Sequence, residues 1–552
     1  LCLFTVTFAS TEEVFALLKW KATLKNNNNS LVASWTQSSN ACGDWYGVMC
    51  FNGTVSKLDI RGVNVIGTLC DFSFSTLHFL AYVDLSMNNL SGVILPHIGN
   101  LTNLVYLDLH TNHISGIIPP LIGSLAKLQT IYIFLPPWIY SYGIGDLRSL
   151  AYLGLSTNSL NDSIPASLGN LTGLSSLNLH EKSSFWLYSR FIEDNNLVED
   201  IPSSICNLTS LRILDLGRNN LKGEIPQCFD IMSVHLEVLD MHQNDLYGTH
   251  LENFSNGSVL RSLDLHDDKL EGKIPQSLAN CKELELLDLG YNHLNNTFPM
   301  WLETLPKLKV LSLRSNKLHG AIRTLSDESM FYELRIIDLS YNAFTGNLST
   351  SLFQKLKSMR KIDKPSKVPT YLGKFGERDY NDSVTVSTKG LELELVRILT
   401  IYVTIDLSSN KFEGYVPSNL GDLITLRGIN LSHNRLQGNI PTSLGNLSFI
   451  ESLDLSFNQL SGEIPQQLPA LTSLSFLNLS HNHLKGCIPQ GRQLSTFDNN
   501  SYECNDGLQG LPVSKGCGSN WTPKTNNSDY ESDYEESCWN SDPQNCLRNR
   551  FI

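Results

Sequence analysis

The chain has 552 residues, of which 41% are hydrophobic and 17% are charged, and 54 acidic against 41 basic side chains give a formal charge of −13. The hydrophobic content excludes a disordered chain, and the mildly acidic charge argues against nucleic acid as a partner. A membrane-spanning helix needs ~20 consecutive apolar residues, and neither of the longest apolar stretches, residues 1–8 and 131–140, reaches that length.

The first predicted element is a capped helix that follows a short apolar segment. Residues 1–8 are apolar, and Thr7 and Ala9 form the small-x-small step that signal peptidase prefers, which indicates the remnant of a secretion signal. A helix is predicted from Ser10, because Ser10 and Glu13 form an S-x-x-E capping box ahead of apolar residues at helical spacing. We expect this helix to cover the first coil of the domain that follows.

Cysteines near both ends of the chain indicate disulfide-closed caps. Cys42 and Cys50 bound the segment CGDWYGVMC, and we predict a disulfide between them. Zinc is disfavoured there, because no second cysteine or histidine pair lies at ligand spacing. Near the other end, the pairing of Cys487, Cys504 and Cys517 stays open, since three cysteines cannot all pair among themselves.

Glycosylation signals are frequent along the chain. Eighteen N-x-S/T sequons occur, and together with the signal remnant they favour a glycosylated extracellular protein. The sequons singled out as glycosylation sites are Asn52, Asn100, Asn170, Asn207, Asn446 and Asn478.

A repeat fills most of the chain. The unit L-x-x-L-x-L-x-x-N-x-L-x-G-x-I-P recurs mostly at steps of 24 residues, and about sixteen coils are counted when Pro136 and Asp268 are accepted at the Asn position. Alternation of Leu with polar residues, as from Leu107 to His110, predicts one short parallel strand in each coil, with Leu inward. The Asn positions are Asn64, Asn88, Asn112, Asn158, Asn195, Asn219, Asn244, Asn292, Asn316, Asn342, Asn410, Asn434, Asn458 and Asn482.

Each recurring feature of the unit has a predicted structural role. The Asn amide is expected to pair with backbone groups of adjacent coils. Gly and Pro then permit a tight bend, and the chain returns through a short helical or 3₁₀ piece such as residues 442–447. No coil can bury its own Leu side chains, so the repeat predicts an α/β solenoid, a right-handed superhelix with a parallel sheet and capped ends.

Three interruptions break the period. About 13 extra residues, EKSSFWLYSRFIE, follow Leu179, and PPWIYSYG replaces the usual signature between residues 131 and 143. The largest interruption, residues 346–401, is an island with a basic cluster, which is read either as a solvated loop or as a determinant of binding specificity. The basic residues of this cluster are Lys355, Lys357, Arg360, Lys361, Lys364 and Lys367.

The landmarks ALLKWKATL, CGDWYGVMC, YNDSVTVSTKGLELELVRILTIYVTIDLSSNKFEG and NDGLQGLPVSKGCG resemble those of plant leucine-rich-repeat receptor-like proteins of the elicitor-response and fungal-resistance class. The resemblance covers nearly the whole chain and implies plant-type 24-residue leucine-rich repeats. In such proteins the island and the last four coils are associated with recruiting a membrane kinase. The 552 residues contain no Gly-rich phosphate loop, HRD-type loop or DFG motif.

The end of the chain departs from that pattern. In similar proteins a transmembrane helix and a basic tail follow a stretch like SDYESDYEES, whereas this chain continues CWNSDPQNCLRNRFI. We therefore expect a chain that enters the secretory pathway and reaches the extracellular space without a membrane anchor of its own. The predicted domains are a signal remnant (1–9), an N-terminal cap (10–55), leucine-rich repeats (56–345), the island (346–401), four C-terminal repeats (402–486), a C-terminal cap (487–520) and an acidic disordered tail (521–552).

The resemblance implies an extracellular receptor-like protein that binds a peptide, protein or glycan elicitor and signals through a recruited co-receptor kinase in plant defence or development. The alternatives are a secreted leucine-rich-repeat inhibitor of a pathogen wall-degrading enzyme, or a soluble ligand-trapping decoy. Inhibitors of that kind are shorter and lack an island, which favours the receptor. We expect no enzymatic activity, no cofactor and no metal.

Polar residues at outward strand positions are the candidate contacts. His110, His180, His242 and His266 share one position, but only His242 and His266 are expected to be close, being one coil apart. A metal site or acid–base pair is conceivable there, but a polar ligand-facing surface is favoured. The predicted ligand-binding residues are Arg212, Asp215, Arg218, Asp240, His242, Arg261, Asp264, His266, Asp288, Tyr291 and Arg314. The predicted co-receptor contacts are Thr404, Asp406, Ser408, Arg427, Asn430, Ser432, Glu451, Ser456 and Phe457.

Overall fold

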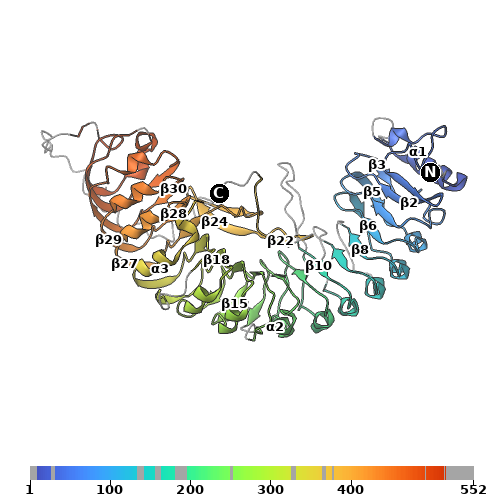
Figure 1. Ribbon diagram of the computed structural model, residues 1–552, viewed down its shortest axis with the longest axis horizontal. Coiled ribbons are helices and arrows are strands. Elements are labelled where there is room, and N and C mark those ends of the chain that lie inside the picture. The colour runs from blue at the N-terminus through green and yellow to red at the C-terminus, as the bar shows by residue number, and fades with distance from the viewer. Residues whose placement is uncertain are drawn as a thin grey trace, which may run out of the picture. The chain divides into compact units, whose positions relative to one another are not determined.

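The fold is taken from a computed structural model that describes residues 9–25, 31–133, 142–155, 163–180, 196–248, 253–324, 331–362, 368–375, 378–491, 493–514, 516 and 517. The chain divides into two compact units, Leu1–Glu271 and Gly272–Ile552. Both units repeat one architecture, in which short strands stack side by side and each is followed by a loop and a return segment (Figure 1).

Parallel strands form the main sheet of the first unit. Leu107 in β6 is buried and lies opposite Val83 in β4 and Ile131 in β8. The central residues of successive strands therefore form one continuous core, as predicted. We call the other side of the sheet, which carries flanking residues such as Tyr106 and Asp108, the outward face. The strands are β1 (Val48–Phe51), antiparallel to its neighbour, and the parallel strands β2 (Thr54–Asp59), β4 (Tyr82–Asp84), β6 (Tyr106–Asp108), β8 (Thr130–Tyr132), β9 (Tyr152–Gly154), β10 (Ser176–Asn178), β11 (Ile213–Asp215), β12 (Val238–Asp240) and β14 (Ser262–Asp264).

The main sheet of the second unit has the same register. Ile337 in β20 lies opposite Leu311 in β18 and Ile405 in β26. The island between β20 and β26 therefore leaves the sheet without interrupting it. The strands are β16 (Leu286–Asp288), β18 (Val310–Ser312), β20 (Ile336–Asp338), β26 (Thr404–Asp406), β28 (Gly428–Asn430), β30 (Ser452–Asp454) and β32 (Phe476–Asn478).

A shorter second strand follows the main strand in many coils. Gly438 ends one such bend with φ 76°, and a Cβ there would lie 2.4 Å from the Tyr415 ring, so the position requires glycine. The second strands of the first unit are β3 (Ile66–Thr68), β5 (Asn89–Val93), β7 (His113–Ser115), β13 (Tyr247–Gly248) and β15 (Lys269–Gly272), which extends one residue past the division. Those of the second unit are β17 (His293–Leu294), β19 (His319–Ala321), β21 (Ala343–Asn347), β27 (Lys411–Tyr415), β29 (Arg435–Asn439), β31 (Gln459–Gly462), β33 (Asn482–Cys487) and β34 (Asn505–Gln509).

Short helices return the chain to the next coil, as predicted for residues 442–447. A proline in extended conformation, such as Pro441, precedes many of them. The 3₁₀ helices are η1 (Leu31–Ser34), η2 (Pro96–Asn100), η3 (Pro120–Ser124), η4 (Tyr142–Asp146), η5 (Ala166–Asn170), η6 (Ser203–Asn207), η7 (Gln276–Asn280), η8 (Met300–Thr304), η9 (Ser358–Arg360), η10 (Ser418–Asp422), η11 (Thr442–Asn446), η12 (Leu468–Ala470), η13 (Leu494–Thr496) and η14 (Asn499–Ser501). The α-helices are α1 (Thr11–Thr23), α2 (Cys228–Met232) and α3 (Thr350–Lys355).

A ladder of asparagine side chains ties the coils together. Asn458 is buried, and its Nδ2 donates to the carbonyls of Leu431, Leu455 and Ser456 at 2.9, 3.2 and 3.0 Å. Its Oδ1 accepts from the backbone N–H of Leu436 at 3.0 Å. One side chain thus satisfies backbone groups of its own coil and of the coil before it, which confirms the predicted role.

The ladder corrects one assignment and leaves two outside the described residues. Val65 N–H donates to Asn88 Oδ1, so the ladder position of the first coil is Val63, not Asn64. Asn64 is exposed and accepts from Asn89 Nδ2 at 2.6 Å. A 24-residue step back from Asn88 leads to Asn64, but the first coil is one residue longer than that step. Asn158 and Asn195 lie outside the described residues.

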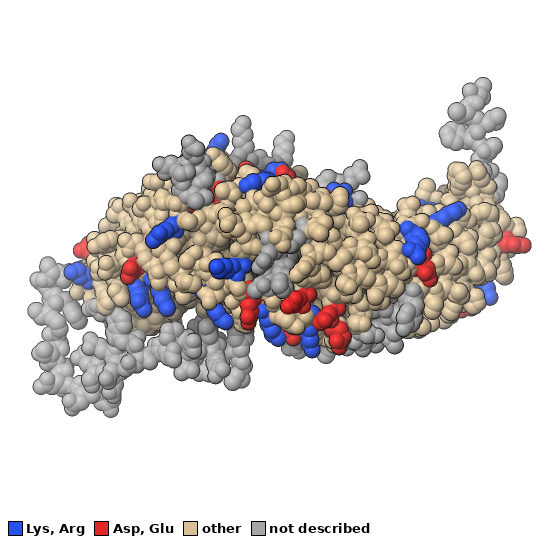
Figure 2. All heavy atoms as spheres, turned by 90° about the horizontal axis from the view of Figure 1, so that it is seen from below, with Lys and Arg blue, Asp and Glu red and all other residues tan. Residues whose placement is uncertain are grey.

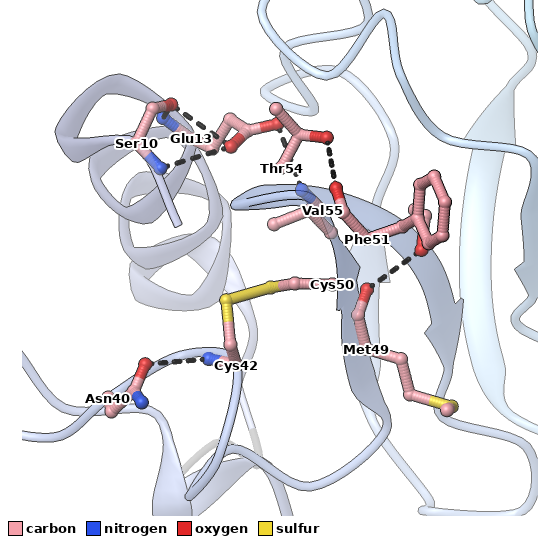
Figure 3. Close-up of a disulfide and its surroundings, with 10 residues drawn as sticks. Ser10, Glu13, Asn40, Cys42, Met49, Cys50, Phe51, Thr54 and Val55 are labelled. Atoms are coloured by element: carbon pink, nitrogen blue, oxygen red, sulfur yellow. Dashed lines mark hydrogen bonds between the residues drawn. A yellow bond between two sulfur atoms is a disulfide. The ribbon is translucent and has the colours of Figure 1, made fainter. Parts of the chain in front are cut away.

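The N-terminal cap forms as predicted (Figure 3). Ser10 Oγ accepts from Glu13 N–H at 3.3 Å, and Glu13 Oε2 accepts from Ser10 N–H at 3.2 Å, which is the reciprocal capping box of α1. The remaining oxygen of Glu13 accepts from Val55 N–H at 3.1 Å, which joins the helix to β2. Trp20 is fully buried and its indole N–H donates to Thr68. The helix therefore covers the open end of the core.

Three disulfides are present among the described residues. Cys42–Cys50 forms as predicted, beside the hairpin β1–β2 (Figure 3). Cys487 pairs with Cys517, which accounts for two of the three cysteines whose pairing the sequence left open, and Cys504 is disulfide-bonded as well. The third, Cys206–Cys228, joins η6 to α2 and was not predicted, because its two cysteines lie 22 residues apart within apparently regular repeats.

The start of the island completes an ordinary coil. Lys355, at the end of α3, is buried, and its Nζ forms a 2.7 Å ion pair with Glu303 of η8. The description of this basic cluster as a solvated loop is therefore wrong for Lys355, because the helix directs the side chain inward. Lys357 and Lys361 are exposed, and Arg360 is paired with Asp422 at 3.2 Å. Lys364 and Lys367 lie outside the described residues.

Two antiparallel hairpins follow in the island. They are β22 (Lys374–Phe375) with β23 (Arg378–Asp379), and β24 (Val384–Thr388) with β25 (Leu391–Leu395). Val384 and Val386 pack on the outward-face residues Leu286, Val310 and Ile336. The β24–β25 hairpin therefore covers part of the outward face in the second unit.

Charged side chains of both signs are present on the surface. Figure 2 shows acidic and basic side chains interspersed over one face of the molecule. Among the described residues, no helix is both long and apolar enough to cross a membrane.

Candidate ligand and partner surface

Aspartates at the end of the main strands are part of the coil structure. In an ordinary coil, the N–H and Oγ of Ser340 both donate to Asp338 Oδ1, at 2.9 and 2.5 Å. Ser408 does the same for Asp406, at 2.9 and 2.6 Å. Each carboxylate thus caps the turn after its strand. The predicted ligand contacts Asp215, Asp240, Asp264 and Asp288 occupy this same position and are all buried.

Three imidazoles gather on the outward face of the first unit. The rings of His242 and His266 stack with centroids 4.7 Å apart, as their one-coil separation predicted. His180 also reaches His242, at 5.1 Å between ring centroids. The expectation that His180 lies too far away is wrong for two reasons. β10 pairs directly with β11, so the extra residues after Leu179 add no strand, and the intervening coil carries Gly217, where a Cβ would lie 2.6 Å from the His242 ring.

Two of the three imidazoles, His242 and His266, are held by strand aspartates. His242 Nδ1 lies 2.5 Å from Asp240 Oδ1, and His266 Nδ1 lies 2.8 Å from Asp264 Oδ1. Burial lowers the pKa of His180 to about 3, with the neighbouring His242 acting in the same direction. Burial alone would also lower the pKa of His242, but the Asp240 carboxylate outweighs it and the pKa is raised.

The accessible predicted contacts of the first unit are arginines. Arg212 is exposed and pairs with Glu237, whereas Arg218 and Arg261 are half-exposed. Arg218 Nε donates to His242 Nε2 at 3.4 Å. A ligand on this face would therefore meet guanidinium groups first, with the buried Asp and His residues behind them.

In the second unit, Arg314 connects the main sheet to the island. It is 2% exposed, and its Nη1 donates to Ser387 Oγ at 2.7 Å and to Asp338 Oδ2 at 3.2 Å. Nη2 donates to Glu392 Oε1. Burial would lower the pKa of Arg314, but the Asp338 carboxylate raises it above its ordinary value. Arg314 is therefore a charged link between sheet and hairpin rather than an open ligand contact.

Tyr291 completes that link. Its hydroxyl accepts from Arg314 Nε at 2.9 Å and donates to Glu392 Oε2 at 3.0 Å. Ser387 and Glu392 were missed as site residues, because they lie more than 70 residues from Arg314 in the sequence. A usable signal was the apolar trio Leu286, Val310 and Ile336 at outward positions, since apolar residues on a solvent face indicate that something covers them.

The predicted co-receptor residues divide into buried and accessible groups. Thr404, Asp406, Ser408, Ser432 and Ser456 are buried. The half-exposed members are Arg427, Asn430, Glu451 and Phe457. Fewer than half of the predicted co-receptor residues are therefore accessible to a partner.

The tip of the β24–β25 hairpin reaches this area. Lys389 N–H donates to Ser452 Oγ at 3.1 Å, and Lys389 Nζ lies 3.6 Å from Glu451 Oε2. Glu451 also pairs with Arg427 at 2.5 Å. The structure thus brings the hairpin tip and two predicted partner contacts together.

Phe457 belongs to an aromatic row that the sequence analysis described only in part. Its ring stacks between His433, with centroids 4.3 Å apart, and His481, with centroids 3.9 Å apart. Burial lowers the pKa of His433 to about 4 and also lowers the pKa of His481. Neutral, half-exposed rings on three successive coils make a flat surface suited to an apolar or aromatic partner group.

The predicted glycosylation sites lie mostly away from the outward face. Asn100, Asn170, Asn207 and Asn446 are exposed and each is the last residue of a 3₁₀ helix. Asn52 is exposed in the turn between β1 and β2. Asn478 differs, because it is half-buried at the end of β32 and its Oδ1 accepts from Ser480 N–H and Oγ at 3.2 and 2.8 Å.

Stacked coils with an inward Leu core and an asparagine ladder define a leucine-rich-repeat protein. Family models agree: a leucine rich repeat N-terminal domain matches residues 10–51 and a leucine rich repeat matches residues 234–294. Further single repeats match residues 79–101, 103–125, 210–232, 425–447, 449–471 and 473–491.

Within this class, part of the chain is similar to plant receptor-like proteins. It is 61% identical over 197 residues to Receptor-like protein 9DC3 of Solanum pimpinellifolium, a match that covers 36% of this chain and 23% of the relative. It is 37% identical over 210 residues to Receptor-like protein 35 of Arabidopsis thaliana, which covers 38% of this chain and 21% of the relative. The matched region thus spans less than a quarter of these relatives.

Solved receptor structures share the fold. A TDR receptor structure is 27% identical with a TM-score of 0.62, over 78% of this chain and 65% of that chain. The ectodomain of the receptor kinase GASSHO1/SCHENGEN3 from Arabidopsis thaliana is 27% identical with a TM-score of 0.57, over 90% of this chain and 61% of that chain. That ectodomain was solved in complex with CASPARIAN STRIP INTEGRITY FACTOR 2.

Proposed function

We propose that this protein is an extracellular receptor-like protein that binds an elicitor or peptide on the outward face and recruits a co-receptor kinase through the island and the last four coils. The observation that carries the proposal is the β24–β25 hairpin, which is fixed to the sheet by Arg314 and whose tip meets Ser452 and Glu451. The likeness to receptor-like proteins and to a receptor ectodomain solved in complex supports the same function.

The ligand side of the surface is centred on the arginines of the first unit. Guanidinium groups recognise carboxylates, phosphates and backbone carbonyls with defined geometry, and they are frequent binding hot spots. Arg212, Arg218 and Arg261 are the accessible members of the predicted set, so they are the residues to test. The buried aspartates and histidines act by holding the strand ends and orienting Arg218.

The ligand test replaces Arg212, Arg218 and Arg261 together with Ala. The purified chain and the variant are each probed with a plant extracellular-fluid peptide fraction and with a fungal culture filtrate, and bound species are read by mass spectrometry. We expect the variant to lose species that the native chain retains. Lys222→Ala is the control, because Lys222 is exposed and lies outside the main sheet of the same unit. Equal retention by the native chain and both variants would show that the ligand binds elsewhere.

The partner test loosens the hairpin without deleting it. Ser387→Ala with Glu392→Gln removes two of the acceptors of Arg314, and we expect capture of solubilised plasma-membrane kinases to fall at least fivefold. Glu413→Gln makes the same charge change at an exposed residue of β27 and should leave capture unchanged. Retention of a fungal pectinase with no kinase would instead favour the secreted-inhibitor function.

A further inference from the structure

The three-histidine cluster of the first unit differs from the ordinary coil in one exchange. Where other coils place a serine hydroxyl beside the strand aspartate, these coils place an imidazole Nδ1. A carboxylate accepts hydrogen bonds, so without a metal Nδ1 carries the proton in His242 and His266. Nδ1 of His266 and the Asp264 carboxylate therefore face each other, and a divalent cation that displaces this proton would meet both groups.

The same cluster contains a buried carboxylate oxygen that no hydrogen-bond donor of the described chain contacts. Asp264 is 1% exposed, and its Oδ2 has no hydrogen-bond partner among the described residues. A buried carboxylate oxygen without a donor is costly, and a bound cation would remove the cost.

We propose that His242, Asp264 and His266 bind a divalent transition-metal cation of the zinc or copper type. One ligand atom from each residue lies within 4.8 Å of those of the other two. Two imidazoles and a carboxylate are the ligand set that borderline divalent metals favour, whereas calcium and magnesium favour oxygen ligands alone. The neighbouring carboxylates supply the negative charge that stabilises such an ion.

Arg218 lies beside this site. Its Nε donates to His242 Nε2 at 3.4 Å, so it places a positive charge beside the ring that a metal would bind. Arg218 is half-exposed and its long side chain can turn toward solvent. Metal binding therefore competes with Arg218, and removing this arginine should strengthen it.

The test is calorimetric titration of the untagged full chain with ZnCl₂ and, separately, CuCl₂ at pH 7, after dialysis against a chelator and alkylation of the exposed free Cys70. We expect saturable binding of one equivalent. His266→Asn and Asp264→Asn should each weaken it at least tenfold, and Arg218→Ala should tighten it at least threefold. Because a misfolded chain does not gain affinity, the Arg218 variant keeps the test decisive even where another variant unfolds.

His110→Asn is the matched control. His110 Nδ1 makes the same contact with Asp108, at 2.6 Å, but the corresponding residues of the adjacent coils are Ser86 and Phe134, so no second imidazole is available. Its removal should leave binding unchanged. Absence of saturable binding, an equal loss in the His110 and His266 variants, or weaker binding by Arg218→Ala would each overturn the proposal.

Discussion

At the scale of the residue, single buried polar side chains hold successive coils together. Asn458 makes four hydrogen bonds to backbone groups, and the same pattern recurs at Asn112, Asn434 and Asn482. A side chain at this position cannot be replaced by an apolar one without leaving those groups unpaired. The ladder therefore converts one conserved residue type into links between neighbouring coils.

Asn458→Ala should loosen its coil. The lost bonds leave buried carbonyl and N–H groups unsatisfied, at ~1–3 kcal/mol each, and exchange of the Leu436 amide hydrogen should speed up about tenfold or more. Asn64→Ala is the control, because Asn64 lies outside the ladder and is exposed. Hydrogen exchange read by mass spectrometry compares the two variants, and equal effects would contradict the role assigned to the ladder.

Asp454 should give the protein a measurable pH dependence. Burial raises the pKa of Asp454 to about 6, against the opposing hydrogen bonds from Ser456. A folded-state pKa above the unfolded value means that its stabilising contribution is present below about pH 4 and is lost as pH rises through 6. Asp454→Asn should therefore increase the free energy of unfolding at pH 7 by about 1–2 kcal/mol and so raise the melting temperature. At pH 4 the substitution should give no gain.

The control for that measurement is Asp267→Asn, an exposed aspartate of the first unit. Its melting temperature should differ from the native value by the same small amount at both pH values. A gain for Asp454→Asn that is equally large at pH 4 and pH 7 would show that packing, and not ionisation, is responsible.

At the scale of the element, the return helices are fixed by contacts that differ from coil to coil. The buried pair of Lys355 and Glu303 joins α3 to η8, and Cys206–Cys228 joins η6 to α2. Other return helices are joined by single side-chain hydrogen bonds, such as that from Ser443 Oγ of η11 to the Ser418 carbonyl of η10 at 2.6 Å. The ion pair and the disulfide are therefore additional constraints on an arrangement that leucine packing and hydrogen bonds already define.

Lys355→Met should destabilise the second unit strongly. It leaves the buried Glu303 carboxylate without its cation, which costs about 3–5 kcal/mol, whereas Lys355→Met with Glu303→Leu should recover much of the loss. The exposed pair Lys307–Glu283, 2.5 Å apart, is the control, and Lys307→Met should cost less than about 1 kcal/mol. Thermal melts of the three variants make the comparison. A double variant as unstable as the single one would mean that the pair contributes by shape alone.

At the scale of the whole molecule, the predicted glycosylation sites and the candidate contact residues lie on different parts of the coils. The return helices carry the exposed sequons Asn100, Asn170, Asn207 and Asn446, and the outward face carries the guanidinium, imidazole and hairpin groups. Glycans on the return side would leave the outward face open to a ligand or a kinase. The arrangement fits a receptor that uses one face of its main sheet.

Glycan occupancy should follow this division. When the chain is expressed behind a complete signal peptide, we expect glycans at the four return-helix sequons and at Asn52. Asn478 should stay unmodified, because its side chain is half-buried and caps the strand end through Ser480. Enzymatic deglycosylation in heavy-oxygen water followed by peptide mass spectrometry marks each occupied site. Full occupancy at Asn478 would show that β32 forms after glycosylation.

The sequence by itself determined the features that repeat or that act locally. Leucine at every second strand position fixed the direction of each side chain, since a strand has a period of two. The capping box at Ser10 and Glu13 and the disulfide between Cys42 and Cys50 involve residues a few positions apart, so spacing was sufficient to predict them.

Only the tertiary structure decided what lies across coils and what covers the outward face. His180 meets His242 because an insertion adds no strand and Gly217 has no side chain. Arg314 meets Glu392, 78 residues away, because the island folds back onto the sheet. Such contacts depend on where a loop returns, which is a balance of apolar burial and charge pairing over the whole unit and has no period in the sequence.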